Sequence, residues 1–222
     1  PTVAAVQGMA LGGGCEFAMH CSARVVAAES YMGLVEAGVG LIPAGGGCKE
    51  FALHAQRIAA RQQYGEPNPT VYAAFQHIFK GRVSKSAHEA REMGLLQPQD
   101  TILFNPDELL YVAIRKARAL AEAGHAPPLA PRAVKVAGRA GIATLEYQLV
   151  NLRDGGFISP HDYRVGRAAA VALCGGEIDG GSLVDEQWLL DVERREFVAL
   201  ARSPETRARL RHMLETGKPL RN

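Results

Sequence analysis

Short apolar runs and glycine-rich turns alternate along the first half of the chain, whereas the second half has the apolar periodicity of helices. The runs typical of strands are Thr2–Val6, Ala23–Ala28, Tyr31–Leu34 and Ile102–Phe104. Helices are predicted over residues 15–21, 48–61, 68–80 and 86–93, all of them between these runs. Strands that alternate with helices in this way predict an α/β fold.

Beyond residue 105 the pattern is almost wholly helical. An acidic first turn at residues 105–108 starts a helix that runs to about residue 122. Further helices are predicted over residues 133–153, 160–173, 183–202 and 204–215, with proline-rich and Gly-Gly breaks between them. We therefore expect two parts, an α/β core over residues 1–105 and a helical extension over residues 106–222.

Composition narrows the class of protein. The chain has 222 residues, of which 47% are hydrophobic and 22% charged, with a net charge of only +2. This balance gives no reason to expect a nucleic acid or a membrane surface as partner. No apolar run reaches the roughly 18 to 20 residues that span a bilayer. The four cysteines are too widely spaced for a disulfide framework or a zinc site, so we expect no metal and a reducing, cytoplasmic location.

The chain opens on Pro1 and enters an apolar strand at once. The sheet partners of such a strand must come from a preceding segment or from a neighbouring chain. We favour the first interpretation, in which the sequence is a piece of a longer protein.

A glycine-rich turn, Gly12-Gly13-Gly14, joins the first apolar segment to a helix. Glycine lets the backbone approach a ligand closely, and the first N–H groups of a helix lack partners within it. Such a turn can bind a phosphate or a developing oxyanion. A tight packing turn is an equally good interpretation. A dinucleotide fingerprint is disfavoured because Phe17 stands where its third glycine belongs.

Two carboxylates lie in apolar surroundings. Glu16 falls in the first turn of the helix after the glycines, where it can also simply complement the helix dipole. Glu36 interrupts the apolar, glycine-containing run of residues 34–42, and a charge there must be paired, protonated or functional. If the two converge, repulsion and desolvation would raise at least one pKa, as in a general acid/base pair. Sequence spacing alone does not bring them together.

Residues 4–19, AAVQGMALGGGCEFAM, closely resemble the signature of the enoyl-CoA hydratase/isomerase (crotonase) superfamily. A second motif agrees in spacing, with Glu36 followed by Gly40 and by Ile42-Pro43-Ala44-Gly45-Gly46. Residues 83–96 are similar to the next helix and turn of the family. The resemblance is close over residues 1–105 and loose beyond them.

The resemblance implies a crotonase-like ββα core without its N-terminal part, followed by helices. It implies an acyl-CoA thioester as substrate, with coenzyme A as part of that substrate and no separate cofactor. Gly13 takes the position of the second oxyanion donor, and Glu16 and Glu36 those of the two catalytic glutamates. The implied reaction is the syn addition of water to a 2-enoyl-CoA. Further candidates for substrate binding are Leu11, Gly12, Gly14 and Lys218, the last of which is as readily a solvated terminal lysine.

The last residues, 205–220, look like the end of crotonase domains that are fused to 3-hydroxyacyl-CoA dehydrogenases of fatty-acid β-oxidation. NAD is then expected only on the fused region, and a homo-oligomer is expected because crotonases commonly form trimers. Since the first oxyanion donor belongs to the N-terminal part, we expect the 222-residue chain alone to be inactive. Two alternatives stay open, a non-catalytic acyl-CoA-binding or scaffold module and an enoyl-CoA isomerase that uses one glutamate.

Overall fold

The computed structural model describes residues 1–61 and 68–222. They form two compact units, and each unit combines two separate stretches of sequence. The first unit consists of Pro1–Leu34 and Arg82–Leu129, and the second of Val35–Gly81 and Ala130–Asn222. The division into a core of residues 1–105 and an extension of residues 106–222 stays a prediction.

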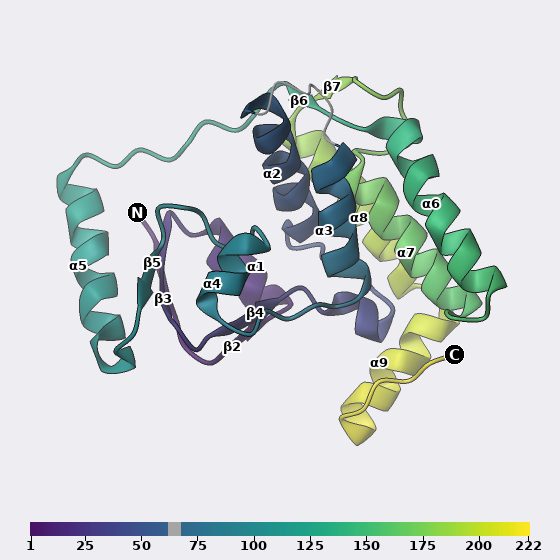
Figure 1. Cartoon of the computed structure of the whole chain (residues 1–222), viewed down its shortest axis with the longest axis horizontal. Coiled ribbons are helices and arrows are strands. Elements are labelled where there is room, and N and C mark those ends of the chain that lie inside the picture. Colours follow the sequence, from purple (N-terminus) through teal and green to yellow (C-terminus); the bar gives the residue numbers. More distant parts are fainter. Residues whose placement is uncertain (62–67) are drawn as a thin grey trace. The chain divides into compact units, whose positions relative to one another are not determined.

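The first unit contains two parallel sheets (Figure 1). The larger has the strand order β1-β3-β5, and the smaller pairs β2 with β4. The strands are β1 Val3–Val6, β2 Met9–Leu11, β3 Ala23–Ala27, β4 Tyr31–Gly33 and β5 Thr101–Leu103. The predicted α/β class is confirmed. Strand β2 is not predicted, because its three residues lie between the positive-φ glycines Gly8 and Gly12 and have no alternation of their own.

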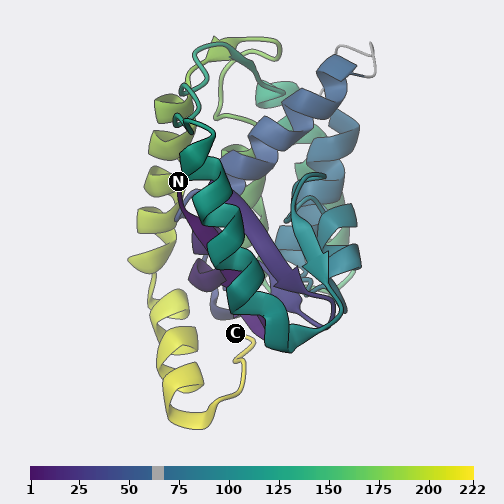
Figure 2. The same ribbon diagram turned by 90° about the vertical axis from the view of Figure 1, so that its left-hand side faces the viewer.

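Helices cover these sheets. They are α1 Gly13–His20, α4 Ala87–Glu92, the 3-10 turn η2 Pro106–Glu108 and α5 Leu109–Glu122. Helix α5 lies across β1 and β3, as Figure 2 shows. Leu109 and Ala113 of α5 pack on Val25 of the central strand. All five residues of β3 are buried, as expected for a strand that is covered on both faces.

The second unit is mainly helical (Figure 1). Its elements are η1 Glu36–Val39, α2 Gly47–Arg61, α3 Asn68–Phe79, β6 Val134–Lys135, α6 Gly138–Asp154, α7 Pro160–Leu173, β7 Leu183–Val184, α8 Glu186–Ala201 and α9 Pro204–Thr216. Helix α7 is central, since it contacts α2, α3, α6, α8 and η1. Residues 168–174 of α7 and its C-cap are all buried. Within the described ranges, no helix has the length and apolar character that crossing a bilayer requires.

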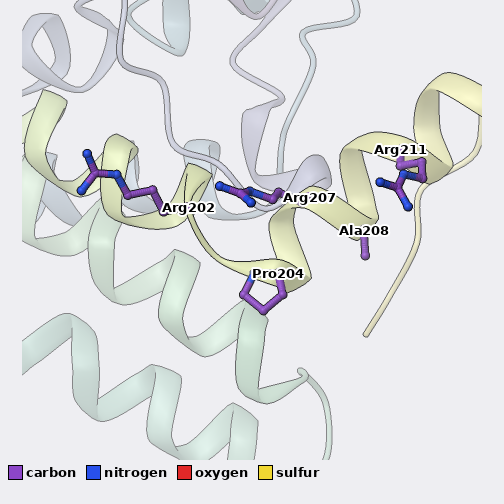
Figure 3. Close-up of a pocket in the computed structure, with 5 residues that line it drawn as sticks. All are labelled: Arg202, Pro204, Arg207, Ala208 and Arg211. Carbon is purple, nitrogen blue, oxygen red and sulfur yellow. The ribbon is translucent and has the colours of Figure 1, made fainter.

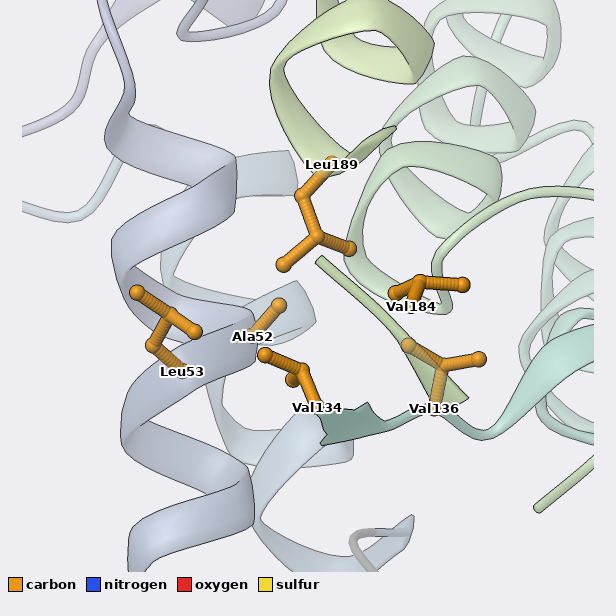
Figure 4. Packing of buried hydrophobic residues seen from close by; sticks show 6 residues of the cluster. All are labelled: Ala52, Leu53, Val134, Val136, Val184 and Leu189. Atoms are coloured by element: carbon orange, nitrogen blue, oxygen red, sulfur yellow. The ribbon is translucent and has the colours of Figure 1, made fainter. Parts of the chain in front are cut away.

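Two predicted helices begin later than the sequence pattern indicates. The helix predicted over residues 133–153 begins at Gly138, and the one predicted over 183–202 begins at Glu186. The residues before them pair as the antiparallel strands β6 and β7. Their β-branched side chains, Val134, Val136 and Val184, pack with Ala52, Leu53 and Leu189 (Figure 4). Tertiary burial of valines on a short ladder therefore outweighs the local helical pattern.

A buried ion pair fixes the C-terminal end of α1. Arg24 on β3 donates from Nε to Asp100 Oδ2 at 2.6 Å, and the two side chains are only 5% and 0% exposed. The Nη1 of Arg24 also donates to the carbonyl of Met19 at 2.6 Å, at the end of α1. Asp100 accepts further N–H groups from Arg24 and Gln97. The pair thus joins α1, β3 and the turn before β5.

A second polar cluster joins α7 to α9 within the second unit. Asp162, in the first turn of α7, forms a 2.7 Å ion pair with Arg209 of α9, which is 2% exposed. Burial acts to raise the pKa of Asp162, but the Ser159 N–H and the Arg209 guanidinium hold it below its ordinary value. His161, 3% exposed, has a lowered pKa because burial and the charge of Arg209 disfavour its protonated form. Arg164 acts in the same direction, whereas Glu205 and Asp162 partly oppose it.

We expect Asp100→Ala to lower the free energy of unfolding by about 3–5 kcal/mol, because the Arg24 charge would stay buried without its partner. The matched control is Asp179→Ala, which breaks the solvent-exposed pair with Arg139 and should cost less than about 1 kcal/mol. Urea unfolding of both variants measures the difference. Equal losses would contradict the structural role given to the buried pair.

The lowered pKa of His161 predicts a loss of stability in mild acid. Below about pH 6.5 a histidine of the unfolded chain takes up a proton, whereas folded His161 resists it. The unfolded state then binds more protons, so the free energy of unfolding falls as pH falls. Asp162 stays ionised over this range because its pKa is lowered from 3.8.

Urea unfolding at about pH 7.5 and about pH 5.5 tests this expectation. His161→Gln, which does not titrate, should lose less stability over this interval than the unchanged protein. His54, whose pKa is also lowered by burial, is present in both proteins and cancels from the comparison. The same pH dependence in both proteins would show that His161 does not contribute to it.

Candidate functional site

The glycine turn between β2 and α1 has a backbone that needs glycine. Gly12 has φ 54° and ψ −129°, a conformation that other residues adopt only with strain. Its N–H donates to the carbonyl of Gly33 on β4 at 2.8 Å, so the turn is fixed to the small sheet. Gly33 in turn tolerates no side chain, because a Cβ there would lie 2.6 Å from the carbonyl oxygen of Arg82. The turn is therefore held rigidly.

The start of α1 offers unused hydrogen-bond donors. Gly13 and Gly14 are its first two residues, and their N–H groups have no partner within the helix. Over residues 1–61 and 68–222, no acceptor contacts either group, and the N-cap Gly12 has no side chain to supply one. A Cβ added at Gly13 or Gly14 would meet nothing within 4 Å. A negative oxygen can therefore reach both donors.

The second glycine-rich turn, before α2, is filled by the chain itself. Glu193 of α8 accepts the Gly46 N–H at 2.8 Å with one carboxylate oxygen and the Lys49 N–H at 2.9 Å with the other. Glu193 is 1% exposed, so this carboxylate serves as a buried cap of α2. Lys49 is buried as well and is paired with Glu50 and Glu186. The anion position at α2 is thus structural, in contrast to that at α1.

Glu16 shares the short helix with the glycine donors. It lies in the first turn of α1, is 6% exposed, and its own N–H donates to Gly12 at 3.0 Å. Its carbonyl oxygen lies 2.7 Å from Nδ1 of His20. Leu11 ends β2 immediately before the turn and is half-buried. The first unit therefore brings together five of the predicted site residues, which are Leu11, Gly12, Gly13, Gly14 and Glu16.

Glu36 and Lys218 belong to the second unit. Glu36 is half-buried and begins η1, which contacts α3, α7 and α9. Gly40 closes η1 in the left-handed region with φ 83°. Lys218 is exposed beyond the end of α9, and its N–H donates to Thr216 Oγ1. The convergence of Glu36 and Lys218 with the residues of the first unit stays a prediction.

One part of the site was missed by the sequence reasoning. Gly33 accepts the Gly12 N–H and lies opposite Leu11 in the pairing of β2 with β4, so it supports the glycine turn. A glycine at the end of an apolar run is a signal for close backbone approach, and it could have been used. The pairing of β2 with β4 gives no comparable signal in sequence.

Titratable groups elsewhere do not form a metal centre. Within residues 1–61 and 68–222, no cluster of three or more histidine, cysteine or acidic side chains has the arrangement of a metal site. All four cysteines lie in these ranges and are thiols rather than disulfides. Burial raises the pKa of the Cys174 thiol to about 12, which makes it a poor nucleophile and a poor ligand.

The arginines of α9 divide into two groups. Arg209 is buried and paired, whereas Arg207 and Arg211 face solvent and, with Arg202, line a surface pocket of about 320 Å³ (Figure 3). Pro204 and Ala208 complete the lining of the pocket. Its charge is positive, but none of the predicted site residues lines it. The pocket therefore adds no group to the candidate site.

Comparison with known sequences identifies relatives. The sequence model described as enoyl-CoA hydratase/isomerase matches residues 1–149. A Bacillus subtilis protein named "Probable 3-hydroxyacyl-CoA dehydrogenase" is 42% identical over 222 residues, which is 100% of this chain and 27% of that protein. A human protein named "Enoyl-CoA hydratase domain-containing protein 2, mitochondrial" is 38% identical over 136 residues, 61% of this chain and 39% of that protein. The chain thus spans less than half the length of these two relatives.

Solved structures share the fold. The carnitinyl-CoA hydratase of Mycobacterium avium has a TM-score of 0.51 at 20% identity, over 99% of this chain and 62% of that one. EchA1_1 of Mycobacterium paratuberculosis has a TM-score of 0.50 at 24% identity, over 99% of this chain and 61% of that one. At such identities the likeness concerns the fold alone. The sequence match over residues 1–149 establishes that the chain belongs to the enoyl-CoA hydratase/isomerase family.

Proposed function

We propose that this chain supplies the second oxyanion donor and the acid/base groups of an enoyl-CoA hydratase. The observation that carries the proposal is the start of α1, where the N–H groups of Gly13 and Gly14 have no acceptor in the described residues and the buried Glu16 follows on the same helix. Family membership supports a hydratase-type enzyme acting on an acyl-CoA thioester.

The proposed chemistry follows from where charge develops. Addition of the water oxygen to C3 of a 2-enoyl-CoA moves negative charge onto the thioester oxygen. The Gly13 N–H donates to that oxygen, and a fixed donor there needs no reorganisation as the charge appears. Glu16 and Glu36 hold and activate the water, and the proton that completes the syn addition goes to C2. The products are the 3-hydroxyacyl-CoA and unchanged carboxyl groups. Leu11, Gly12, Gly14 and Lys218 are proposed to contact the substrate.

The larger protein is part of the same proposal. The relative named as a 3-hydroxyacyl-CoA dehydrogenase matches all of this chain with 27% of its own length. This supports a fusion in fatty-acid β-oxidation, with NAD bound only by the dehydrogenase region. The thiol state of all four cysteines supports a cytoplasmic location.

The edge of the larger sheet supports further strands or a homo-oligomer. Strand β1 lies at one end of the order β1-β3-β5, and Ala5 on it is exposed. Among the described residues, no strand pairs with its second edge. An unpaired edge is a template for another strand, either from the rest of the protein or from a second copy.

We expect Glu16→Gln and Glu36→Gln each to lower kcat for crotonyl-CoA hydration by about 10²–10⁴-fold, because each removes a proton-transfer group. The assay uses the natural gene product that contains this chain, and the 222-residue chain alone is expected to show no turnover. Glu29→Gln, which alters an exposed glutamate of the first unit, is the matched control and should leave kcat unchanged.

The outcome separates the alternatives. Near-normal hydration by either glutamine variant would overturn the assignment of that glutamate. Conversion of a 3-enoyl-CoA that survives loss of one glutamate would indicate an isomerase. Acyl-CoA binding without turnover in the natural gene product would indicate a non-catalytic module.

A substitution at Gly13 tests the oxyanion donor. Gly13 is the first residue of α1, a position whose φ proline adopts readily, so Gly13→Pro removes the N–H with little strain. We expect kcat to fall about 10²–10³-fold. Gly13→Ala keeps the N–H and places its Cβ in open space, so it is the matched control. Equal activity of the alanine and proline variants would contradict the role of this N–H.

A further inference from the structure

Helix α9 reaches back to the turn that carries Glu36, and this contact lies wholly within the second unit. The hydroxyl of Thr206, in the first turn of α9, donates to the carbonyl oxygen of Gly40 at 2.8 Å. Thr206 is 0% exposed. The two residues are 166 positions apart in sequence, so this is a specific tertiary contact.

The peptide that Thr206 holds is the one that closes η1. The Gly40 carbonyl and the Leu41 N–H belong to one planar peptide unit, in which the two groups point in opposite directions. The Leu41 N–H donates to the carbonyl oxygen of Glu36 at 3.1 Å. Fixing the direction of the Gly40 carbonyl therefore fixes the direction of the Leu41 N–H. Through this peptide, the Thr206 hydroxyl orients the backbone of Glu36.

His161 sets the direction of the Thr206 hydroxyl. Its Nε2 lies 2.9 Å from Thr206 Oγ1. A hydroxyl has one proton, and Thr206 gives it to Gly40, so Nε2 must be the donor in this contact. Nδ1 of His161 then carries the lone pair, and in the described residues it is buried without a hydrogen-bond partner. The lowered pKa of His161 agrees with this neutral ring.

The approach of α7 and α9 to the turn is as close as the atoms allow. A Cβ at Gly40 would lie 2.9 Å from both His161 Nε2 and Thr206 Oγ1, and 3.2 Å from Cδ of Arg209. Gly40 also has φ 83°, which disfavours any side chain. Arg209 is held in turn by Asp162 at 2.7 Å and donates to Asn222 Oδ1 at 2.8 Å. The donor to Gly40 thus sits on a buried, fully braced helix start.

We propose that Thr206 is a positioning residue for Glu36, acting through the Gly40–Leu41 peptide, with His161 holding the Thr206 hydroxyl in its donating orientation. This inference rests on the proposed function, since it assumes that Glu36 acts on the substrate. Its structural part, the control of the Leu41 N–H by Thr206, stands independently of the reaction.

The structural part is tested by amide hydrogen exchange. Thr206→Val keeps the shape of the side chain and removes the hydroxyl, and the exchange of the Leu41 N–H should become at least about 5-fold faster. Thr206→Ser keeps the hydroxyl and should restore the protection. Thr144→Val is the matched control, because that hydroxyl donates only within its own helix, to Ala140. Unchanged protection of Leu41 in Thr206→Val would overturn the proposal.

The functional part is tested by kinetics on the natural gene product with crotonyl-CoA. Thr206→Val should lower kcat about 10- to 100-fold, as expected for a misplaced catalytic group, while KM changes less than about 3-fold. Thr206→Ser should lie within about 3-fold of the unchanged enzyme. In the Glu36→Gln background, Thr206→Val should cause no further loss, because the group that it positions is already gone.

The results separate failure of this proposal from failure of the proposed function. Full activity of Glu36→Gln would refute the proposed role of Glu36. A large loss in Glu36→Gln together with an unchanged kcat in Thr206→Val would refute the positioning role alone. A loss in Thr206→Val that persists at the same factor in the Glu36→Gln background would show a merely structural role.

His161→Phe supplies a second variant if Thr206→Val does not fold. It keeps a ring of similar size but removes the Nε2–H that orients the Thr206 hydroxyl. We expect a kcat loss of about 3- to 10-fold and faster exchange at Leu41, with no further loss of kcat in the Glu36→Gln background. Unchanged kcat and unchanged exchange in this variant would overturn the role of His161.

Discussion

The N–H groups that begin each helix need acceptors, and the way this need is met organises both units. Ser86, Ser159, Asp185 and Ser203 cap α4, α7, α8 and α9. Helix α2 takes the buried carboxylate of Glu193, and α6 takes the carbonyls of Cys174 and Ile178. Helix α5 continues from η2, which Asn105 caps. Against this background, the glycine start of α1 stands apart, and its unused donors are available to a ligand.

The buried polar side chains extend this logic to segments far apart in sequence. Arg24 binds the end of α1 and, through Asp100, the turn before β5, while Arg209 is held against the start of α7 by Asp162. Each buried charge has an opposite charge and additional hydrogen bonds, which is the condition under which burial is tolerated. These contacts define the orientation of the short elements that carry the candidate site residues.

Much of the fold could be predicted from local pattern. The strands of the first unit and the helices that begin at a serine or aspartate have signals within a few residues of each other. The glycine turn and Glu16 could be predicted as one site for the same reason. Strands β6 and β7 could not, because their valines become strand-like only against Leu53 and Leu189, which are distant in sequence. The capping of α2 by Glu193, 147 residues from Gly46, is equally invisible to local reasoning.

The crowding around Gly40 also has a meaning for the family as a whole. Two independent demands, left-handed backbone and van der Waals contact with α7 and α9, leave hydrogen as the one substituent that fits. A homologue that has a bulkier amino acid here must have displaced its last helix or rebuilt the preceding bend. One aligned column would thus sort relatives by architecture before any of their structures is determined.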